Sequence, residues 1–172
     1  GKQYETLFPA MITSWREKWD QGDFPFYFVQ IAPYNYGEDS DVTVAELRDA
    51  QRKTLELDHT GMVVTMDIGD PNNIHPSNKR DVGERLAFWA LSNDYAKDIV
   101  YSGPLFAEAE FLGPKVIVAF DFAEGLKLVS KESFFEVAGT DGVFYPAKAK
   151  VEANKIVTSS SKVKVVKHVR YA

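Results

Sequence analysis

The chain has 172 residues, of which 45% are hydrophobic and 26% charged, and these values are normal for one globular domain or two small ones. The 25 acidic residues outnumber the 20 basic ones, so the net charge of −5 gives no reason to expect a nucleic acid or an anionic membrane as a partner. Cysteine is absent, which excludes disulfides, a catalytic thiolate and a cysteine-ligated zinc site.

The first half of the chain alternates between helical and strand-like patterns. Large apolar residues recur every four positions from Tyr4 to Trp19, which predicts a helix. A continuous apolar run from Phe24 to Ile31 follows, as expected for a strand that is covered on both faces. Thr43 can cap a second helix over residues 44–57, and residues 62–66 have the pattern of a second buried strand.

A third helix is predicted to begin after Asn78, because Asp81 follows three residues later in a near capping box. The order of helix, strand, helix, strand and helix is typical of a parallel sheet covered by helices. Two strands are too few for a stable sheet of this kind, so we expect further strands upstream in the protein. Residues 1–101 are therefore predicted to be the C-terminal part of an α/β domain.

The pattern changes near Tyr101, and no helical period is visible after it. Short apolar or alternating segments predict strands, and Asp141-Gly142 and Asn154-Lys155 are typical hairpin turns. The expected strands cover residues 116–120, 126–129, 134–137, 143–151, 156–158 and 162–166. We therefore expect residues 102–172 to form a small antiparallel β domain that is truncated at its end.

The last part of the chain is basic, with seven lysine or arginine residues and a single acid, Glu152, from Lys148 onward. A nucleic-acid surface is one interpretation of this charge. However, Lys162 and Lys164 alternate with valines, which favours a strand with one solvent-exposed face, and lysines on such strands also discourage edge pairing.

The loop after the second strand carries the residues that could do chemistry. Open α/β enzymes keep their active sites at the carboxyl ends of strands, and His75 lies there, after Asp67 and Asp70. A neutral His75 could take a proton from a nucleophile while a carboxylate or carbonyl holds its ring. The alternative is a locally bonded histidine beside two turn-capping aspartates. No residue of the chain is an evident nucleophile for His75.

Two tyrosines, Tyr34 and Tyr36, follow the first strand and are candidates for substrate contact. The dense aromatic run of Phe24 to Phe28 is more typical of a core. The three histidines lack metal-ligand spacing, and the loop aspartates do not alternate as in an EF-hand, so we expect no metal and no other cofactor. No apolar segment approaches the roughly 20 residues that span a bilayer.

Several segments of the chain together match the motifs of one enzyme family. They are Tyr4 to Ile12 with Trp15-Arg16, Phe24 to Tyr34, Asp67-Ile68-Gly69-Asp70, Ile74-His75-Pro76 with Lys79 to Leu86, Tyr101-Ser102-Gly103-Pro104, and Val169-Arg170-Tyr171. These segments resemble the sialate O-acetylesterases, and they occur in order over most of the chain and are sparser in the β half. These enzymes are similar to SGNH hydrolases, so the resemblance implies a flavodoxin-like α/β sheet.

The resemblance implies an esterase that removes acetyl groups from sugars with a serine nucleophile, a histidine and no cofactor. The family's histidine corresponds to His75 in this sequence. The segments that carry the serine and the oxyanion-hole groups do not occur in the chain, so we expect a C-terminal fragment that is inactive without the missing N-terminal part. The implied substrate is an acetylated sialic acid or, alternatively, a plant polysaccharide such as xylan. The implied location is secreted, periplasmic or lysosome-like.

One position departs from the pattern of many SGNH hydrolases, which have an aspartate three residues before the histidine. Asn72 occupies that position here. We expect Asp70 to orient His75, with Asp67 or a backbone carbonyl as the alternatives. Two other functions stay open: a non-catalytic carbohydrate-binding or interaction module, and a structural fragment or processed subunit. Exposed aromatic residues on the β half would favour the module, and the candidates are Phe144, Tyr145 and Tyr171.

Overall fold

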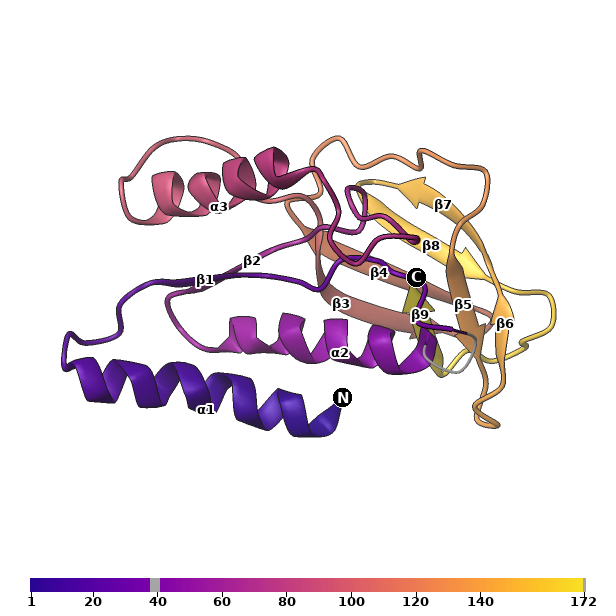
Figure 1. Ribbon diagram of the computed structural model, residues 1–172. Coiled ribbons are helices and arrows are strands. Elements are labelled where there is room, and N and C mark those ends of the chain that lie inside the picture. The colour runs from indigo at the N-terminus through magenta and orange to yellow at the C-terminus, as the bar shows by residue number, and fades with distance from the viewer. Residues whose placement is uncertain (38–40, 172) are drawn as a thin grey trace. The chain divides into compact units, whose positions relative to one another are not determined.

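A computed structural model describes residues 1–37 and 41–171 of the chain and divides into two compact units, Gly1–Ser102 and Gly103–Ala172 (Figure 1). The first unit contains helices and a parallel pair of strands, and the second contains antiparallel sheets. The boundary predicted from the sequence lies next to this division. That the units are the end of an esterase domain and a separate β domain stays a prediction.

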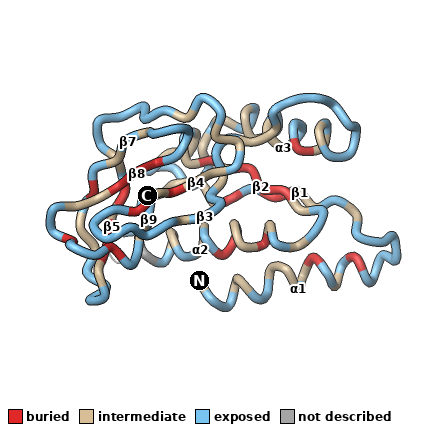
Figure 2. The backbone as a smooth tube through the Cα atoms, turned by 180° about the vertical axis from the view of Figure 1, so that it is seen from behind, coloured by how far each residue is buried: buried red, intermediate tan, exposed pale blue. Residues whose placement is uncertain are grey.

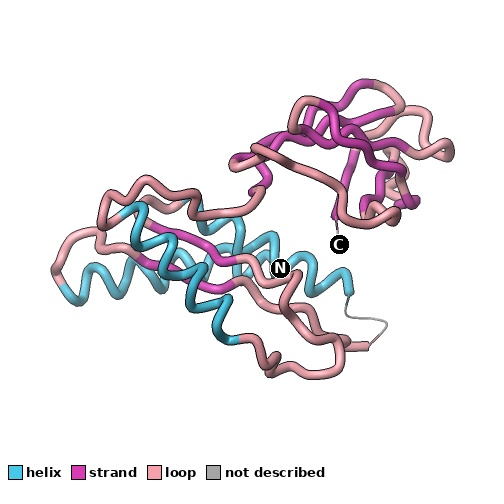
Figure 3. Tube along the Cα trace, turned by 90° about the horizontal axis from the view of Figure 1, so that it is seen from above, coloured by secondary structure: helices cyan, strands magenta, loops and turns pink. Residues whose placement is uncertain are grey.

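In the first unit, two strands pair in parallel between helical layers. Figure 3 shows the two strands side by side with helices flanking them. The elements are α1 (Lys2–Trp19), β1 (Phe26–Val29), α2 (Asp41–Lys53), the 3₁₀ turn η1 (Thr54–Glu56), β2 (Thr60–Val63) and α3 (Lys79–Asn93). Their order is the predicted one, and both strands are shorter than predicted.

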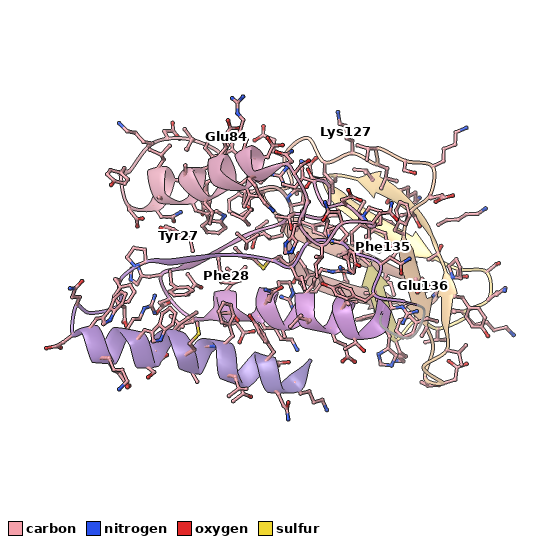
Figure 4. The ribbon with its side chains drawn as sticks, viewed as in Figure 1. Tyr27, Phe28, Glu84, Lys127, Phe135 and Glu136 are labelled. Atoms are coloured by element: carbon pink, nitrogen blue, oxygen red, sulfur yellow. The ribbon has the colours of Figure 1, made fainter. Side chains whose placement is uncertain are left out.

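The two faces of β1 are covered by different helices. Phe28 packs on Phe8 of α1, with ring centroids 4.9 Å apart, while Tyr27 packs on Trp89 of α3 at 6.1 Å. Tyr27 and Phe28 accordingly point to opposite sides of the strand (Figure 4). At Gly61 of β2 a Cβ atom would lie 2.4 Å from the Trp89 ring, so only glycine lets α3 approach this closely.

A single arginine of α1 joins the starts of both strands. Arg16 is 5% exposed, and its Nε and Nη2 atoms donate to the Phe24 carbonyl at 3.1 and 2.8 Å. Nη2 also donates to the carbonyls of Asp58 at 3.0 Å and His59 at 3.2 Å. Phe24 precedes β1 and His59 precedes β2. The His59 carbonyl also accepts from the Phe26 N–H at 2.9 Å, whereas the guanidinium is the donor found for the partly buried carbonyls of Phe24 and Asp58.

The second unit consists of two antiparallel sheets. One sheet has the order β3-β4-β8-β7 and the other β6-β5-β9. The strands are β3 (Leu105–Leu112), β4 (Lys115–Asp121), β5 (Phe135–Ala138), β6 (Phe144–Pro146), β7 (Lys148–Glu152), β8 (Lys155–Ser159) and β9 (His168–Tyr171). Buried residues of both sheets form one core around Val116, Val137 and Ile156, and Figure 2 shows the buried stretches along the backbone.

Several strand predictions for this unit are confirmed and others are wrong. The hairpin at Asn154 joins β7 to β8, and Ala153 and Asn154 both have the positive φ that tight hairpins require. Residues 126–129 and 162–166 are not strands. In the second of these segments Val163 and Val166 are buried and Val165 is exposed, so the chain turns there instead of alternating. The strands β3 and β9 were not predicted.

The buried guanidinium makes a specific prediction for stability. Arg16→Met keeps the apolar stem but removes the donor from the Phe24 and Asp58 carbonyls, so it should lower the free energy of unfolding by about 2 to 4 kcal/mol. Tryptophan fluorescence during urea unfolding reports the stability of the first unit, because Trp15, Trp19 and Trp89 all belong to it.

Arg80→Met is the matched control, since the Arg80 side chain is 86% exposed and pairs with Glu84 on the helix surface. It should leave the urea midpoint unchanged. An Arg16→Met protein as stable as the wild type would show that water replaces the guanidinium without loss.

The phenol of Tyr27 makes a prediction for high pH. Burial, together with the 2.9 Å hydrogen bond that its hydroxyl donates to Asp94 Oδ2, raises the pKa of Tyr27 from 10.0 to about 12. Because the folded-state pKa is the higher one, this stabilisation is complete below pH 10.0 and is lost as the pH rises through about 12. An ultraviolet titration at 295 nm should show a late phenolate step that Tyr27→Phe removes and Asp94→Asn moves to lower pH. A titration with no late step would contradict this assignment.

Candidate functional site

The carboxyl ends of β1 and β2 lie side by side because the strands are parallel and in register from Phe26↔Thr60 to Val29↔Val63. The loops that follow both strands therefore meet at one edge of the sheet, which is where open α/β folds bind ligands. A cavity of about 260 Å³ opens at this edge. Its wall is mostly apolar and includes Ile31, Ile74 and Val82, with Thr65 and Lys79 among its polar groups.

The wall that follows β1 is held by buried polar side chains. Gln51 of α2 is 7% exposed, and its amide donates to the Val29 carbonyl at 3.4 Å and accepts from the Ile31 N–H at 3.0 Å. The Gln30 amide donates to the Arg48 carbonyl at 3.1 Å, and the Thr65 hydroxyl donates to the Gln30 carbonyl at 2.9 Å. Satisfied polar contacts of this kind fix a single backbone path.

The His75 loop is built from side chains that bond to backbone groups two residues further along. Asp70 Oδ1 accepts from the Asn72 N–H at 2.9 Å, and Asn73 Oδ1 accepts from the His75 N–H at 2.9 Å. The Asp70 carbonyl also accepts from the Asn73 N–H at 3.1 Å. Asn78 caps α3 as predicted, accepting from the Asp81 N–H at 3.2 Å. These bonds shape the loop and present His75 at its surface.

The His75 imidazole is exposed, and within residues 1–37 and 41–171 no hydrogen bond or ion pair of its ring is found. The structure therefore does not bring the Asp70 carboxylate onto the ring, because Asp70 bonds to the Asn72 N–H instead. It does not bring a backbone carbonyl onto the ring either. The roles of His75 and Asp70 stay predictions.

The loop with Tyr34 and Tyr36 lies against the His75 loop. The Asn35 N–H donates to the Pro71 carbonyl at 2.9 Å, and a Cβ atom on Gly69 would lie 2.3 Å from the Pro33 ring. Tyr34 and Tyr36 pack edge to face, with centroids 4.8 Å apart, and Tyr36 is exposed. The structure thus brings the two predicted tyrosines to the loop next to that of His75.

Asp67 has a different partner, which the sequence reasoning missed. Arg85 of α3 donates to both of its carboxylate oxygens, at 2.8 and 2.6 Å, and to the Val64 carbonyl at 2.7 Å. These hydrogen bonds hold the pKa of the Asp67 carboxyl below its usual value. The signal in the sequence was an arginine inside the apolar stripe of α3, between Val82 and Trp89, where a charge needs a partner.

Among the residues that the structure describes, no group of three or more His, Asp or Glu side chains is arranged to hold a metal ion. None of the helices in this part of the chain is long and apolar enough to cross a membrane. That the mechanism needs no metal stays a prediction from the residue spacing and the family resemblance.

Comparison with known proteins identifies relatives among the carbohydrate esterases, although no family model matches the chain. The sialate O-acetylesterase of Rattus norvegicus is 29% identical over 154 residues, which are 78% of this chain and 28% of the relative. That of Homo sapiens is 28% identical over 154 residues, or 78% of this chain and 29% of the relative. The chain thus spans less than a third of the length of these curated relatives.

A solved structure agrees with the sequence relatives. The crystal structure of a carbohydrate acetylesterase from Xanthomonas citri is 37% identical to this chain and superimposes with a TM-score of 0.87. The similarity covers 98% of this chain and 40% of that protein. The resemblance predicted from the sequence motifs is therefore confirmed: over most of its length the chain is similar to sialate O-acetylesterases and to a carbohydrate acetylesterase.

Proposed function

We propose that this chain is the C-terminal part of a carbohydrate O-acetylesterase and that His75 is the catalytic histidine. The observation that carries the proposal is the position of the His75 loop, at the carboxyl edge of a parallel strand pair and beside a largely apolar cavity. The names of the relatives, sialate O-acetylesterase and carbohydrate acetylesterase, support the reaction class. The proposal includes β1 and β2 as strands of a flavodoxin-like SGNH sheet whose other strands lie upstream.

The proposed mechanism has two half-reactions that share one proton acceptor. A serine from the upstream part attacks the acetyl carbonyl, and the His75 imidazole takes the serine proton. The imidazolium then gives this proton to the departing sugar oxygen, which leaves an acetyl-serine. Water, deprotonated by the same imidazole, then attacks the acetyl-serine, and the imidazolium returns the proton to the serine oxygen as the acetyl group leaves as acetic acid, which ionises to acetate. The exposed ring of His75, which bonds to none of the described residues, is open to such a nucleophile.

The proposed substrate is an acetylated sugar, with O-acetyl sialic acid ahead of acetylated xylan. Lys79 lies in the cavity wall, and its ammonium group favours a sugar that carries a carboxylate. Tyr34 and Tyr36 are the proposed sugar contacts, because an edge-to-face pair presents both a ring face and a hydroxyl. The resemblance also implies a secreted, periplasmic or lysosome-like protein.

A non-catalytic carbohydrate-binding module on the β unit has less support. The Arg170 guanidinium lies 4.1 Å from the Phe144 ring centroid, and the Lys162 ammonium lies 5.1 Å from that of Tyr145. Tyr171 packs against Phe135 at 4.7 Å. Phe144 and Tyr145 are half-buried beside these cations, and Tyr171 is exposed, so of the three candidate rings Tyr171 alone is open for stacking.

The first test concerns the 172-residue chain by itself. Because it lacks the proposed serine and oxyanion-hole segments, and such donors alone are worth about 10² to 10³ in rate, it should hydrolyse 4-nitrophenyl acetate no faster than buffer. Activity is measured before and after treatment with a serine-directed inhibitor. Turnover that the inhibitor abolishes would show that the chain contains its own nucleophile and would overturn the fragment proposal.

The second test uses the full-length enzyme. His75→Ala should lower kcat by roughly 10³-fold or more, because the variant removes the proposed acceptor of the serine proton. His168→Ala is the control, since this exposed histidine belongs to the β unit. Circular dichroism should be unchanged in both variants. Near wild-type kcat in His75→Ala would end the proposal for this residue.

In the same enzyme, Asp70→Asn tests the proposed orienting carboxylate. Asparagine keeps an acceptor for the Asn72 N–H, so the variant removes the charge and preserves the turn. If Asp70 stabilises the imidazolium, kcat should fall more than about 10²-fold; a loss of roughly tenfold or less assigns the role to a carbonyl. Asn72→Asp restores the usual spacing and is the complementary variant.

A further inference from the structure

The guanidinium of Arg85 connects both ends of the His75 loop. It bonds to the Val64 carbonyl just after β2, to the Asp67 carboxylate where the loop begins, and it extends from α3, the helix into which the loop leads. The bonds join residues 21 and 18 positions apart. Bonds between residues of the loop itself span two or three positions, and one further long-range bond joins the Pro71 carbonyl to the Asn35 N–H. Arg85 is therefore the long-range anchor that ties the loop to α3.

The three bonds use the particular geometry of arginine. Nη1 and Nη2 donate to the two different oxygens of Asp67, and Nη1 also donates to the Val64 carbonyl. A lysine at this position would supply a point charge and could not keep the bidentate fork together with the carbonyl contact. The arrangement thus fixes the direction as well as the distance between the strand end and the helix.

We propose that Arg85 is a positioning residue for His75, and that the Asp67 carboxylate serves Arg85 and not the imidazole. The inference rests on the proposed function of His75. Through its bonds to Asp67 and the Val64 carbonyl, Arg85 fixes the start of the loop relative to α3. The local bonds of Asp70 and Asn73 fix the loop conformation from there to His75. Displacing a catalytic group by about 1 Å can cost as much as 10²-fold in rate.

The role is one of positioning more than of stability. The Asp67 side chain is 62% exposed, and exposed ion pairs contribute little to folding. α3 has its own anchors, because Trp89 is buried against Gly61 and Tyr27, and Asp94 at its end accepts from the Tyr27 hydroxyl. Loss of Arg85 should therefore loosen the loop and leave the helix packed.

The test uses Arg85→Lys and Asp67→Asn in the full-length enzyme. Both should lower kcat by about tenfold or more with little change in KM, and neither should move the midpoint of the pH–rate profile. Arg80→Lys, on the same helix but in an exposed pair with Glu84, should have no effect. If Asp67 were the direct partner of the imidazole, Asp67→Asn would shift the midpoint while Arg85→Lys would not.

A readout independent of activity is hydrogen exchange of the same full-length variants, measured by mass spectrometry. A peptide covering residues 67–78 should exchange about tenfold faster in both variants, while one covering residues 86–93 should be unchanged. Full kcat together with unchanged exchange of residues 67–78 would overturn the positioning role.

The two proposals fail in distinguishable ways. Normal activity of His75→Ala would remove the proposed function, and the exchange of residues 67–78 would still report on the anchor. Loss of activity in His75→Ala, combined with wild-type kcat in both anchor variants, would remove only the positioning role.

Discussion

The contact between Arg16 and the carbonyls before β1 and β2 sets the level at which both strands begin. Each strand then runs four residues in matched register, so both end at the same level. The loops that carry Tyr34 and His75 meet because of this, roughly 10 Å further along the strands. The proposed site at the carboxyl ends of the strands thus depends on the buried Arg16 guanidinium at their amino ends, where no catalytic residue is expected.

The order of elements in the first unit could be read from the sequence, because each helix has a strong local period and Asn78 is a clear cap. The strand ends could not. Around β1 the backbone groups bond to the side chains of Arg16 and Gln51, which come from helices before and after the strand. An apolar run in the sequence indicates that a segment is buried. Where the strand pairing ends depends on hydrogen bonds from these distant side chains.

In the second unit, the alternation of apolar and polar residues predicted the strands less well, because contacts distant in sequence again decide which residues are buried. Lys162 to Val166 alternates in sequence, yet Val163 and Val166 share the core because the chain turns between them. β3 was missed although it contains apolar residues such as Phe106 and Phe111, and in the structure most of the strand is exposed. Packing against neighbouring strands, which no single segment encodes, settles both cases.

The candidate site shows the same limit. The position of His75 follows from the strand before it, but Asp67 and Asp70 are equivalent in the sequence. The structure distinguishes them: one carboxylate receives a guanidinium fork from 18 residues away, and the other closes a turn over two residues. In the sequence, Asp67 and Arg85 are indistinguishable from an ordinary turn aspartate and an ordinary helix arginine, so their bidentate pair cannot be predicted.

The side-chain amide of Gln51 has the same donor and acceptor groups as a peptide bond, and it occupies the Val29 carbonyl and the Ile31 N–H on the edge of β1 that faces away from β2. It imitates one residue of a neighbouring strand. A third strand joining this edge would have to end before Val29, because beyond that point its partners are already taken. The sheet can therefore widen along the part of β1 before Val29, while the backbone groups beside the cavity stay bonded to Gln51.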